Sequence, residues 1–456
     1  MAAPAGPAVH RGAIEEKLAG ANDAPGAPPA PPPGFGFRWT IVALLFAATT
    51  INYVDRQVLG ILAPTLTREL GWSEVQYGAI VSWFTFAYGL GFLAVGRMMD
   101  RIGVRRGLAL SIVAWSLAAI SHALARTAAG FSLARAALGL GESGNFPGAI
   151  KATAEWFPKR ERALATGIFN AGSNVGAIAA PLMVPVITLR WGWRWAFVAT
   201  GALGFAWLAL WLAVYRDPER HPRVSPAELA HIRGDPAEPA GAVSWLQLLR
   251  HRQTWAFFLG KGMTDPVWWF YLFWLPKYLD ATWGAKLGGL AAPLVVIYLV
   301  ADAGSVGGGW ISGALIRRGW SVNAGRKTAM LVAALLIVPT MLAPLAGSLW
   351  VAVGIVSVAA AAHQWWSANL FTLASDLFPR RAVASVVGIG GFAGAMGGFL
   401  FQRATGYVLQ ATGSRYGIIF VACGLAYVSA LGVIHLLVPR LEPARLEGAK
   451  VPATGS

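Results

Sequence analysis

Long apolar segments follow one another along almost the whole chain and are separated by short polar stretches. Each is close to the ~20 residues that a helix needs to cross the hydrocarbon layer of a bilayer. Hydrophobic residues fill 56% of the 456 positions and charged residues only 13%, whereas soluble domains carry about 25% charged residues. The sequence therefore predicts an all-α, multi-pass membrane protein. Its twelve expected transmembrane helices cover approximately 39–63, 77–98, 107–125, 128–150, 163–188, 193–215, 254–280, 290–314, 328–347, 349–375, 383–410 and 415–438.

The placement of charge predicts the orientation and argues against a nucleic-acid partner. The formal net charge is +16, but most Lys and Arg residues fall on alternate loops and near the two ends of the chain. Cytoplasmic loops of membrane proteins carry such an excess of positive charge. We therefore expect both termini in the cytoplasm, with the basic residues facing the lipid bilayer and not a nucleic acid.

Polar stretches divide the apolar segments into two groups of six. Residues 1–37 are rich in Ala, Pro and Gly and lack the apolar core of a signal peptide, so we expect a disordered tail there. The stretch 216–252 is polar and is expected to contain a short helix near 225–233. The expected units are a cytoplasmic N-terminal tail (1–37), an N-terminal six-helix bundle (38–215), a cytoplasmic linker (216–252), a C-terminal six-helix bundle (253–438) and a cytoplasmic C-terminal tail (439–456).

An internal repeat indicates that the two groups are equivalent. The segment 155–160, Glu-Trp-Phe-Pro-Lys-Arg, returns 221 residues later as Asp-Leu-Phe-Pro-Arg-Arg at 376–381. At the same offset, Gly167 corresponds to Gly388 and Gly176 to Gly397. Duplicated halves with a binding site near the membrane midplane between them are typical of secondary transporters.

The loop 96–106, Gly-Arg-Met-Met-Asp-Arg-Ile-Gly-Val-Arg-Arg, resembles the cytoplasmic loop signature of the major facilitator superfamily. The resemblance implies the major facilitator fold, with two pseudo-symmetric six-helix bundles. Asp100, Arg101 and Arg105 are then the candidate cytoplasmic gate, since a carboxylate can accept hydrogen bonds from a nearby helix N-terminus. The second half has Gly313 where the repeat places the acid, and the alternative is that the basic residues only anchor the topology.

Within that superfamily, the segment 52–56 (Asn-Tyr-Val-Asp-Arg), together with Arg135 and 139–143 (Gly-Leu-Gly-Glu-Ser), is similar to the anion:cation symporters. These include carriers of galactonate, glucarate and hexuronates. The segment 264–277, Thr-Asp-Pro-Val-Trp-Trp-Phe-Tyr-Leu-Phe-Trp-Leu-Pro-Lys, looks most like bacterial hexuronate transporters. The resemblance covers 39–438 and implies a monomer in the bacterial inner membrane, a small anionic substrate, and no cofactor or metal besides the coupled proton.

Charged residues inside the apolar helices are the strongest candidates for a functional site. A charge at the centre of a membrane helix costs roughly 2.5–3.5 kcal/mol on insertion scales, so such residues are rarely without a role. Adjacent helical residues point about 100° apart, so one of Asp55 and Arg56 is expected to face the cavity and the other a neighbouring helix. The group comprises the cations Arg56, Arg135 and Lys261 and the acids Asp55, Glu142, Asp265 and Asp302.

Burial disfavours the charged form of a carboxyl group, which favours proton uptake. We hypothesise that Asp55 and Glu142 carry the coupled protons and that Arg56, with Lys261 or Arg135, binds the substrate carboxylate. Lys261 and Asp265 are four residues apart and can also pair directly. The alternative is that these charges form ion pairs that only stabilise the bundle.

Further candidates are polar and aromatic residues in the same helices. His363 occupies the repeat position of Glu142, where it can titrate or bind a sugar hydroxyl, although a histidine used only in helix packing is an equal alternative. The remaining candidates for contacts with the substrate are Tyr53, Tyr88, Asn170, Asn174, Trp366 and Asn369.

The sequence thus predicts a proton-coupled symporter that imports a sugar acid, such as the hexuronates glucuronate or galacturonate, by alternating access. A symporter or exchanger for another organic anion, such as an aldonate, an aldarate or an aromatic acid, is the nearest alternative. A transporter-like nutrient sensor is a more distant one. An enzyme is not expected, because no nucleophile, metal-ligand set or carboxylate cluster at a water boundary stands out.

Overall fold

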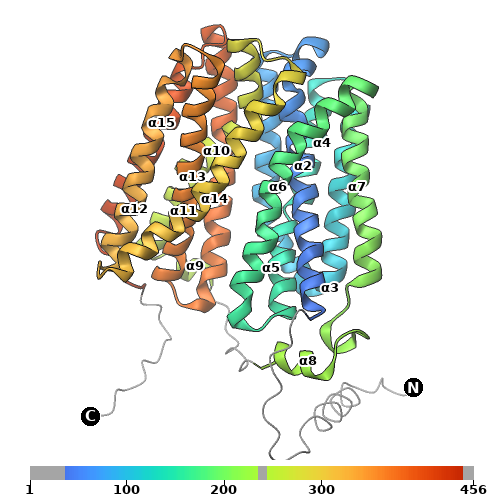
Figure 1. Cartoon of the computed structure of the whole chain (residues 1–456), viewed down its shortest axis with the longest axis vertical. Coiled ribbons are helices and arrows are strands. Elements are labelled where there is room, and N and C mark those ends of the chain that lie inside the picture. Colours follow the sequence, from blue (N-terminus) through green and yellow to red (C-terminus); the bar gives the residue numbers. More distant parts are fainter. Residues whose placement is uncertain (1–35, 235–243, 445–456) are drawn as a thin grey trace, which may run out of the picture.

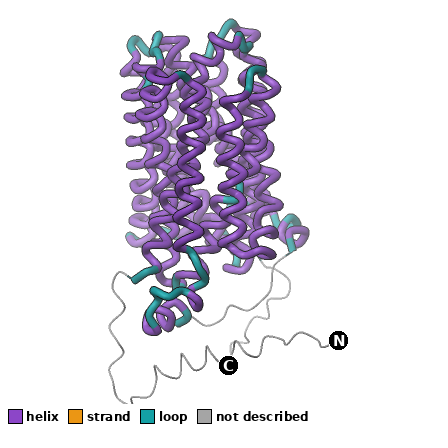
Figure 2. Tube along the Cα trace, turned by 90° about the vertical axis from the view of Figure 1, so that its right-hand side faces the viewer, coloured by secondary structure: helices purple, strands orange, loops and turns teal. Residues whose placement is uncertain are grey.

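The computed structural model describes residues 36–234 and 244–444, and these residues contain helices, turns and loops but no strand. Figures 1 and 2 show long helices that run side by side in one bundle. The first group contains α2 (Arg38–Leu70), α3 (Glu74–Ser121), α4 (Ala128–Glu142), α5 (Asn145–Trp156), α6 (Lys159–Trp191) and α7 (Trp193–Val214). The short helices α8 (Pro226–Ile232) and α9 (Trp245–Leu248) follow. The second group contains α10 (Arg252–Trp283), α11 (Ala291–Arg317), α12 (Val322–Ile337), α13 (Leu349–Leu377), α14 (Arg380–Thr412) and α15 (Gly417–Leu437).

These helices account for the twelve expected crossings. α3 contains two crossings, α4 and α5 together form one, and α12 continues into the 3-10 helix η4 (Val338–Leu345) to form another. By length and apolarity alone, nine stretches of the described residues qualify as membrane spans. The three crossings that do not qualify are α2, α4 with α5, and α10, which contain Arg56, Arg135 and Lys261. All of the charged candidates except Asp302, which is in α11, therefore lie in the helices with the weakest membrane signal.

A sharp break at Gly103 separates the two crossings within α3. Gly103 has φ 78° and ψ 161°, a conformation that is open to glycine and strained for residues with a side chain. The break falls inside the loop motif 96–106, so the glycine of the motif provides the reversal of the chain. It lies at the same end of the bundle as the start of α2.

The internal repeat is confirmed in three dimensions. α6 and α14 are both 33 residues long, and each begins directly after a proline N-cap, Pro158 or Pro379. Gly176 of α6 lies against the backbone carbonyl of Thr50 in α2, and Gly397 of α14 lies against that of Gly262 in α10. A Cβ atom at either glycine would clash with that carbonyl, so both halves use the same close helix crossing.

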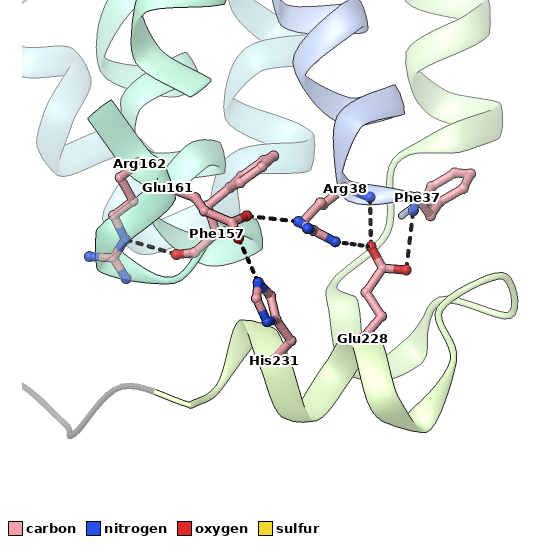
Figure 3. A network of polar contacts seen from close by, with 7 residues as sticks. All are labelled: Phe37, Arg38, Phe157, Glu161, Arg162, Glu228 and His231. Atoms are coloured by element: carbon pink, nitrogen blue, oxygen red, sulfur yellow. Dashed lines mark hydrogen bonds and ion pairs between the residues drawn. The ribbon is translucent and has the colours of Figure 1, made fainter. Parts of the chain in front are cut away.

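The linker helix α8, predicted near 225–233, is confirmed at Pro226–Ile232 and is attached to the first half. Glu228 accepts hydrogen bonds from the backbone N–H groups of Phe37 and Arg38 at 3.1 and 3.0 Å (Figure 3). Arg38 also donates to Glu161 at the start of α6 at 2.9 Å, and His231 Nε2 lies 2.7 Å from the same carboxylate. Partial burial raises the pKa of Glu161, but the bonds from His231 and Arg38 outweigh it and hold the pKa below its usual range.

The end of the bundle that carries α8 is called the linker face, and the other end the opposite face. The C-terminal segment also packs at the linker face: the Leu441 N–H donates to Asn323 Oδ1 at 3.2 Å and the Ala444 N–H to the Leu377 carbonyl at 2.8 Å. Most of the expected N-terminal tail (1–35), part of the linker (235–243) and 445–456 lie outside the described residues.

The two halves meet along three helix pairs: α3 with α14, α2 with α10, and α6 with α11. At the opposite face they are joined by the ion pairs Lys277–Glu74 (2.7 Å) and Arg68–Asp280 (2.5 Å). The Tyr77 hydroxyl also donates to the Phe273 carbonyl there. These contacts close the seam between the halves on the side away from the linker.

Candidate functional site

A buried ion pair lies inside the first half, at the level where α4 ends. Arg56 of α2 donates from Nε to Glu142 Oε2 at 2.8 Å and from Nη2 to Asn52 Oδ1 at 3.0 Å, and Nη2 also lies 2.8 Å from Glu142 Oε2 in the ion pair. Glu142 is the last residue of α4, and α5 begins only at Asn145. The interruption of the helix places the carboxylate at a helix end inside the bundle, where Arg56 is its cation.

Aromatic rings surround the Arg56 guanidinium, and one of them belongs to the other half. The guanidinium carbon lies 4.5 Å from the ring centre of Tyr53, 4.8 Å from Tyr88, 5.3 Å from Phe84 and 5.4 Å from Trp269. Trp269 lies on α10 of the second half, so Arg56 is at the interface between the halves. Cation–π contacts of this kind hold a cation in an apolar environment without neutralising its charge.

Arg135 lies close to Arg56 but is less completely partnered. Its Nη1 donates to the backbone carbonyl of Arg56 at 3.2 Å, while Nε and Nη2 are buried and have no hydrogen-bond partner among the residues that the structure describes. Its guanidinium lies 4.6 Å from the Phe84 ring centre and 5.0 Å from that of Phe273 on the second half. Buried donors are nearly always paired in native structures, so two unpaired guanidinium nitrogens at an interface are a ready site for an anion.

Asp55 points away from this interface. Its side chain is almost completely buried near Thr200 of α7, and among the described residues neither carboxylate oxygen has a well-formed hydrogen bond or an ion pair. Of these two adjacent residues, Arg56 faces the second half, because it contacts Trp269. Asp55 is enclosed within the first half. A buried carboxyl without a cation or a donor is much less costly in its protonated, neutral form.

The second half contributes the pair Lys261–Asp265 on α10. The Lys261 Nζ lies 2.8 Å from Asp265 Oδ2, which confirms the direct pairing that the four-residue spacing predicts. Nζ also lies 4.3 Å from the Phe371 ring centre. Asp265, Trp269 and Phe273 follow at intervals of four residues and therefore share one face of α10. Because Trp269 and Phe273 contact the arginines of the first half, Asp265 lies on the same inner face, one turn toward the linker face.

Three candidates from α13 are tied to neighbouring helices of their own half. His363 Nδ1 lies 2.5 Å from the Tyr427 hydroxyl, and its ring stacks on Trp268 with centroids 5.0 Å apart. Trp366 donates to Thr264 Oγ1 at 3.2 Å, and Asn369 Nδ2 donates to the Gly308 carbonyl at 3.1 Å. The structure does not bring His363 to the Arg56–Glu142 pair, although the repeat places it at the position equivalent to Glu142.

The candidates on α6 and α11 are more open. Asn170 is exposed and Asn174 is half-buried, with its Oδ1 3.3 Å from Ser173 Oγ. Asp302, on α11, is half-buried and has no hydrogen-bond or ion-pair partner among the described residues. α6 and α11 pack against one another across the interface between the halves, so these residues lie on the two helices that meet there.

The candidate gate lies at the linker face. The side chain of Asp100 is outside the described part of the structure, and Arg101 is exposed. Arg105 Nη2 donates to the Leu212 carbonyl of α7 at 2.5 Å, and the Arg105 carbonyl accepts from Trp211 Nε1 at 3.0 Å. Arg105 therefore fastens the motif loop to the end of α7. Within the described residues, no group of three or more His, Cys, Asp and Glu is arranged to hold a metal ion.

Sequence reasoning missed the ion pairs of the opposite face. Glu74, Lys277, Arg68 and Asp280 lie near helix ends, where charged residues are common and carry no signal of a partner. The two members of each pair come from different halves and are about 200 residues apart in the chain, with separations of 203 and 212. Only packing of α2 and α3 against α10 brings them together.

Comparison with known proteins decides the family. The model of the Major Facilitator Superfamily matches residues 45–402. The chain belongs to the Major Facilitator Superfamily. Its relatives in this superfamily include the hexuronate transporter of Escherichia coli (strain K12), which is 32% identical over 385 residues, covering 83% of this chain and 89% of the relative.

Two more relatives and one solved structure extend the comparison. The galacturonate transporter of Dickeya chrysanthemi is 32% identical over 310 residues, covering 66% of this chain and 90% of the relative. The D-galactonate transporter of Escherichia coli O6:H1 is 28% identical over 414 residues, covering 88% and 95%. A bacterial homologue of the human lysosomal transporter Spinster, in an inward-facing and occupied conformation, superposes with a TM-score of 0.68 at 20% identity over 89% of this chain and 96% of that one.

Membership of the Major Facilitator Superfamily gives the buried charges a physical context. The protein spans the membrane and acts in transport, not as an enzyme. In a transport protein of two halves, residues that contact across the seam are the ones whose surroundings change when the halves move. Arg56 and Arg135 both contact rings of the second half, so any movement of one half against the other would alter the environment of both cations.

Proposed function

We propose that this protein is a proton-coupled symporter that imports a hexuronate, glucuronate or galacturonate, across a bacterial inner membrane. The observation that carries the proposal is the pair of unpartnered guanidinium nitrogens of Arg135, buried at the interface beside the Arg56–Glu142 pair. A carboxylate there would accept charge-assisted hydrogen bonds from Arg135. The names of the relatives, hexuronate and galacturonate transporters among them, favour a sugar acid as the bearer of that carboxylate.

Proton coupling follows from the way in which Arg56 is occupied. Two of its nitrogens lie 2.8 Å from a single oxygen of Glu142, so its charge is neutralised while Glu142 is ionised. A proton on Glu142 weakens this pairing and frees Arg56 to join Arg135 in binding the substrate carboxylate. One proton taken up with one monoanion leaves the net charge of the buried cluster unchanged. The enclosed Asp55, which has no ion-pair partner among the described residues, provides a second proton site in the same half.

Alternating access then carries both ligands together. In the structure, the seam is closed at the opposite face by Lys277–Glu74 and Arg68–Asp280. The distribution of Lys and Arg along the sequence makes the linker face the cytoplasmic one. In this arrangement the site releases substrate and proton toward the cytoplasm, and the ion pairs of the opposite face must separate before the next substrate enters.

The proposal is tested by counterflow of labelled glucuronate in proteoliposomes loaded with unlabelled glucuronate. Glucuronate and galacturonate should compete strongly, galactonate and glucarate more weakly, and neutral glucose not at all. Equal competition by glucose would contradict the anion site. If galactonate competed more strongly than glucuronate, the preferred substrate would be an aldonate and not a hexuronate.

Proton coupling needs a separate measurement in the same vesicles. Glu142→Gln should abolish accumulation driven by an imposed proton gradient while it preserves counterflow exchange, which needs no net proton movement. Glu219→Gln, in an exposed pair with Arg233 outside the bundle, is the control and should accumulate substrate normally. Full proton-driven accumulation by Glu142→Gln would show that another group carries the proton or that transport is not proton-coupled.

A further inference from the structure

We propose that Asp302 makes the central cavity electrically polar and thereby selects sugar acids with one carboxylate against dicarboxylic sugar acids. The inference rests on the proposed function, because it assumes that the substrate carboxylate binds at Arg135. In this proposal, the second half excludes substrates that carry a second carboxylate at the far end of the sugar, and the first half binds the first carboxylate.

The position of Asp302 on α11 directs its side chain away from lipid. The exposed strip of α11 contains Leu299, Val300 and Trp310. At about 100° per residue, Asp302 lies roughly 100° from the middle of that strip. It lies one turn from Tyr298, which is buried and whose ring centroid is 6.2 Å from that of Trp268 on α10. A half-exposed carboxylate in the middle of a span belongs at a water-filled cavity, because exposure to lipid is costly.

Asp302 lies at the level of the other charged groups. The contact between Tyr298 and Trp268 aligns α11 with α10, and Asp302 and Asp265 each lie about one turn from that contact toward the linker face. α11 also packs against α6 of the first half. Asp302 therefore lies in the second half near its interface with the first, at the depth of Asp265. It is about one turn from the layer of Trp269 and Arg56, and about two turns (~12 Å in rise) from the layer of Phe273 and Arg135.

The charges on the two walls are of opposite sign. On the second-half wall, Lys261 neutralises Asp265 at 2.8 Å, whereas Asp302 has no cation among the described residues. On the first-half wall, the two unpaired nitrogens of Arg135 offer an uncompensated positive end. A molecule with a carboxylate at one end and hydroxyl groups at the other fits this polarity, because hydroxyl groups can donate to the Asp302 carboxylate.

A sugar acid with carboxylates at both ends does not fit. Once one carboxylate binds at Arg135, the second must approach the second-half wall and Asp302. A like charge within about 6–8 Å, at an effective dielectric constant of about 20, disfavours binding by roughly 30- to 100-fold. Asp302 is thus a specificity-determining residue: its carboxylate accepts hydrogen bonds from the hydroxyl groups of a monocarboxylate and repels a second carboxylate.

The test compares inhibition of glucuronate counterflow by glucarate and by galacturonate. In the wild-type protein, glucarate should need at least about ten times the concentration of galacturonate. Asp302→Asn keeps the size and polarity of the side chain and removes its charge, so this ratio should fall about tenfold or more, while Asp302→Glu should keep it. Asp217→Asn, an exposed acid of the linker, is the matched control and should behave as wild type.

A measurement on the wild-type protein keeps the proposal testable if the variants do not fold. A glucarate lactone has one carboxylate masked, and it should compete nearly as well as galacturonate while glucarate itself does not. Active counterflow with a ratio that is the same in Asp302→Asn and wild type overturns the inference and leaves the proposed function standing. Absence of glucuronate counterflow in the wild-type protein overturns the proposed function itself.

Discussion

Arg135→Met should separate the roles of the two buried arginines. Methionine keeps much of the volume of the arginine stem between Phe84 and Phe273 but removes the charge and every donor. The loss of a charge-assisted hydrogen bond to the substrate carboxylate is worth about 1.5–3 kcal/mol. The dissociation constant for glucuronate should therefore rise by roughly 10- to 150-fold.

The same change should not destabilise the fold. Two nitrogens of Arg135 are buried without partners, so the native protein already bears the cost of their desolvation. Replacing such a group by an apolar side chain of similar volume is often neutral or stabilising. Arg56→Met should behave in the opposite way, because it leaves Glu142 buried without its cation, and breaking a buried pair costs about 3–5 kcal/mol.

The assay measures binding and stability on the same samples in nanodiscs. Calorimetric titration with glucuronate gives the dissociation constant, and thermal unfolding without substrate gives the stability. Arg194→Met, which removes an exposed arginine near the start of α7, is the matched control and should change neither. An Arg135→Met protein that binds glucuronate within twofold of wild type would refute the assignment of the carboxylate to Arg135.

Three further perturbations test the closed seam, the repeat and the linker. Lys277→Ala breaks the partly buried ion pair with Glu74 at the opposite face, which is worth about 1–2 kcal/mol. An introduced Tyr77→Cys should therefore react roughly 5- to 30-fold faster with an impermeant maleimide added on that side. An unchanged rate would show that the pair does not hold the seam. Gly176→Ala should lower the free energy of unfolding by about 1–3 kcal/mol, because the new Cβ overpacks against α2. The control Gly167→Ala, with no atom within 4 Å of the new Cβ, should leave it unchanged. Equal unfolding temperatures of the two variants would argue against the close crossing of α6 and α2. Because the pKa of Glu161 is lowered in the folded protein, its stabilising contribution is complete above the normal carboxyl pKa and is lost as the pH falls through the lowered value. In Glu161→Gln, the unfolding temperature should therefore fall less steeply as the pH is lowered. An unchanged slope would contradict this account.

Helix boundaries and the division into halves are local or nearly local properties, and for this reason they could be predicted. The predicted segment 193–215 is α7 at Trp193–Val214, and 349–375 is α13 at Leu349–Leu377. The hydrophobic requirement of a bilayer acts on each segment separately, so apolar length is enough to find it. The repeat is visible in the sequence because a Pro N-cap and a close glycine crossing constrain the same positions in both halves.

Pairing inside the bundle was predictable only where one helix contains both partners. Lys261 and Asp265 share a helix face at a spacing of four, so their contact follows from helix geometry. Arg56 and Glu142 lie on α2 and α4, 86 residues apart, and nothing in the sequence marks one as the partner of the other. His363 shows the converse, because the repeat gives it the position of Glu142 but its neighbours Trp268 and Tyr427 engage it in packing.

The sequence by itself determined that this chain crosses a membrane with duplicated halves and that its candidate charges lie within four of its spans. The length of apolar segments, the spacing of the repeat and the motif residues are properties of short stretches, so they can be read from the sequence without a structure. Only the tertiary structure decided which charges are neutralised, which donors stay unpaired, and that Arg56 faces the second half while Asp55 does not. Those facts depend on how helices from distant parts of the chain are rotated against one another, and packing alone determines that rotation.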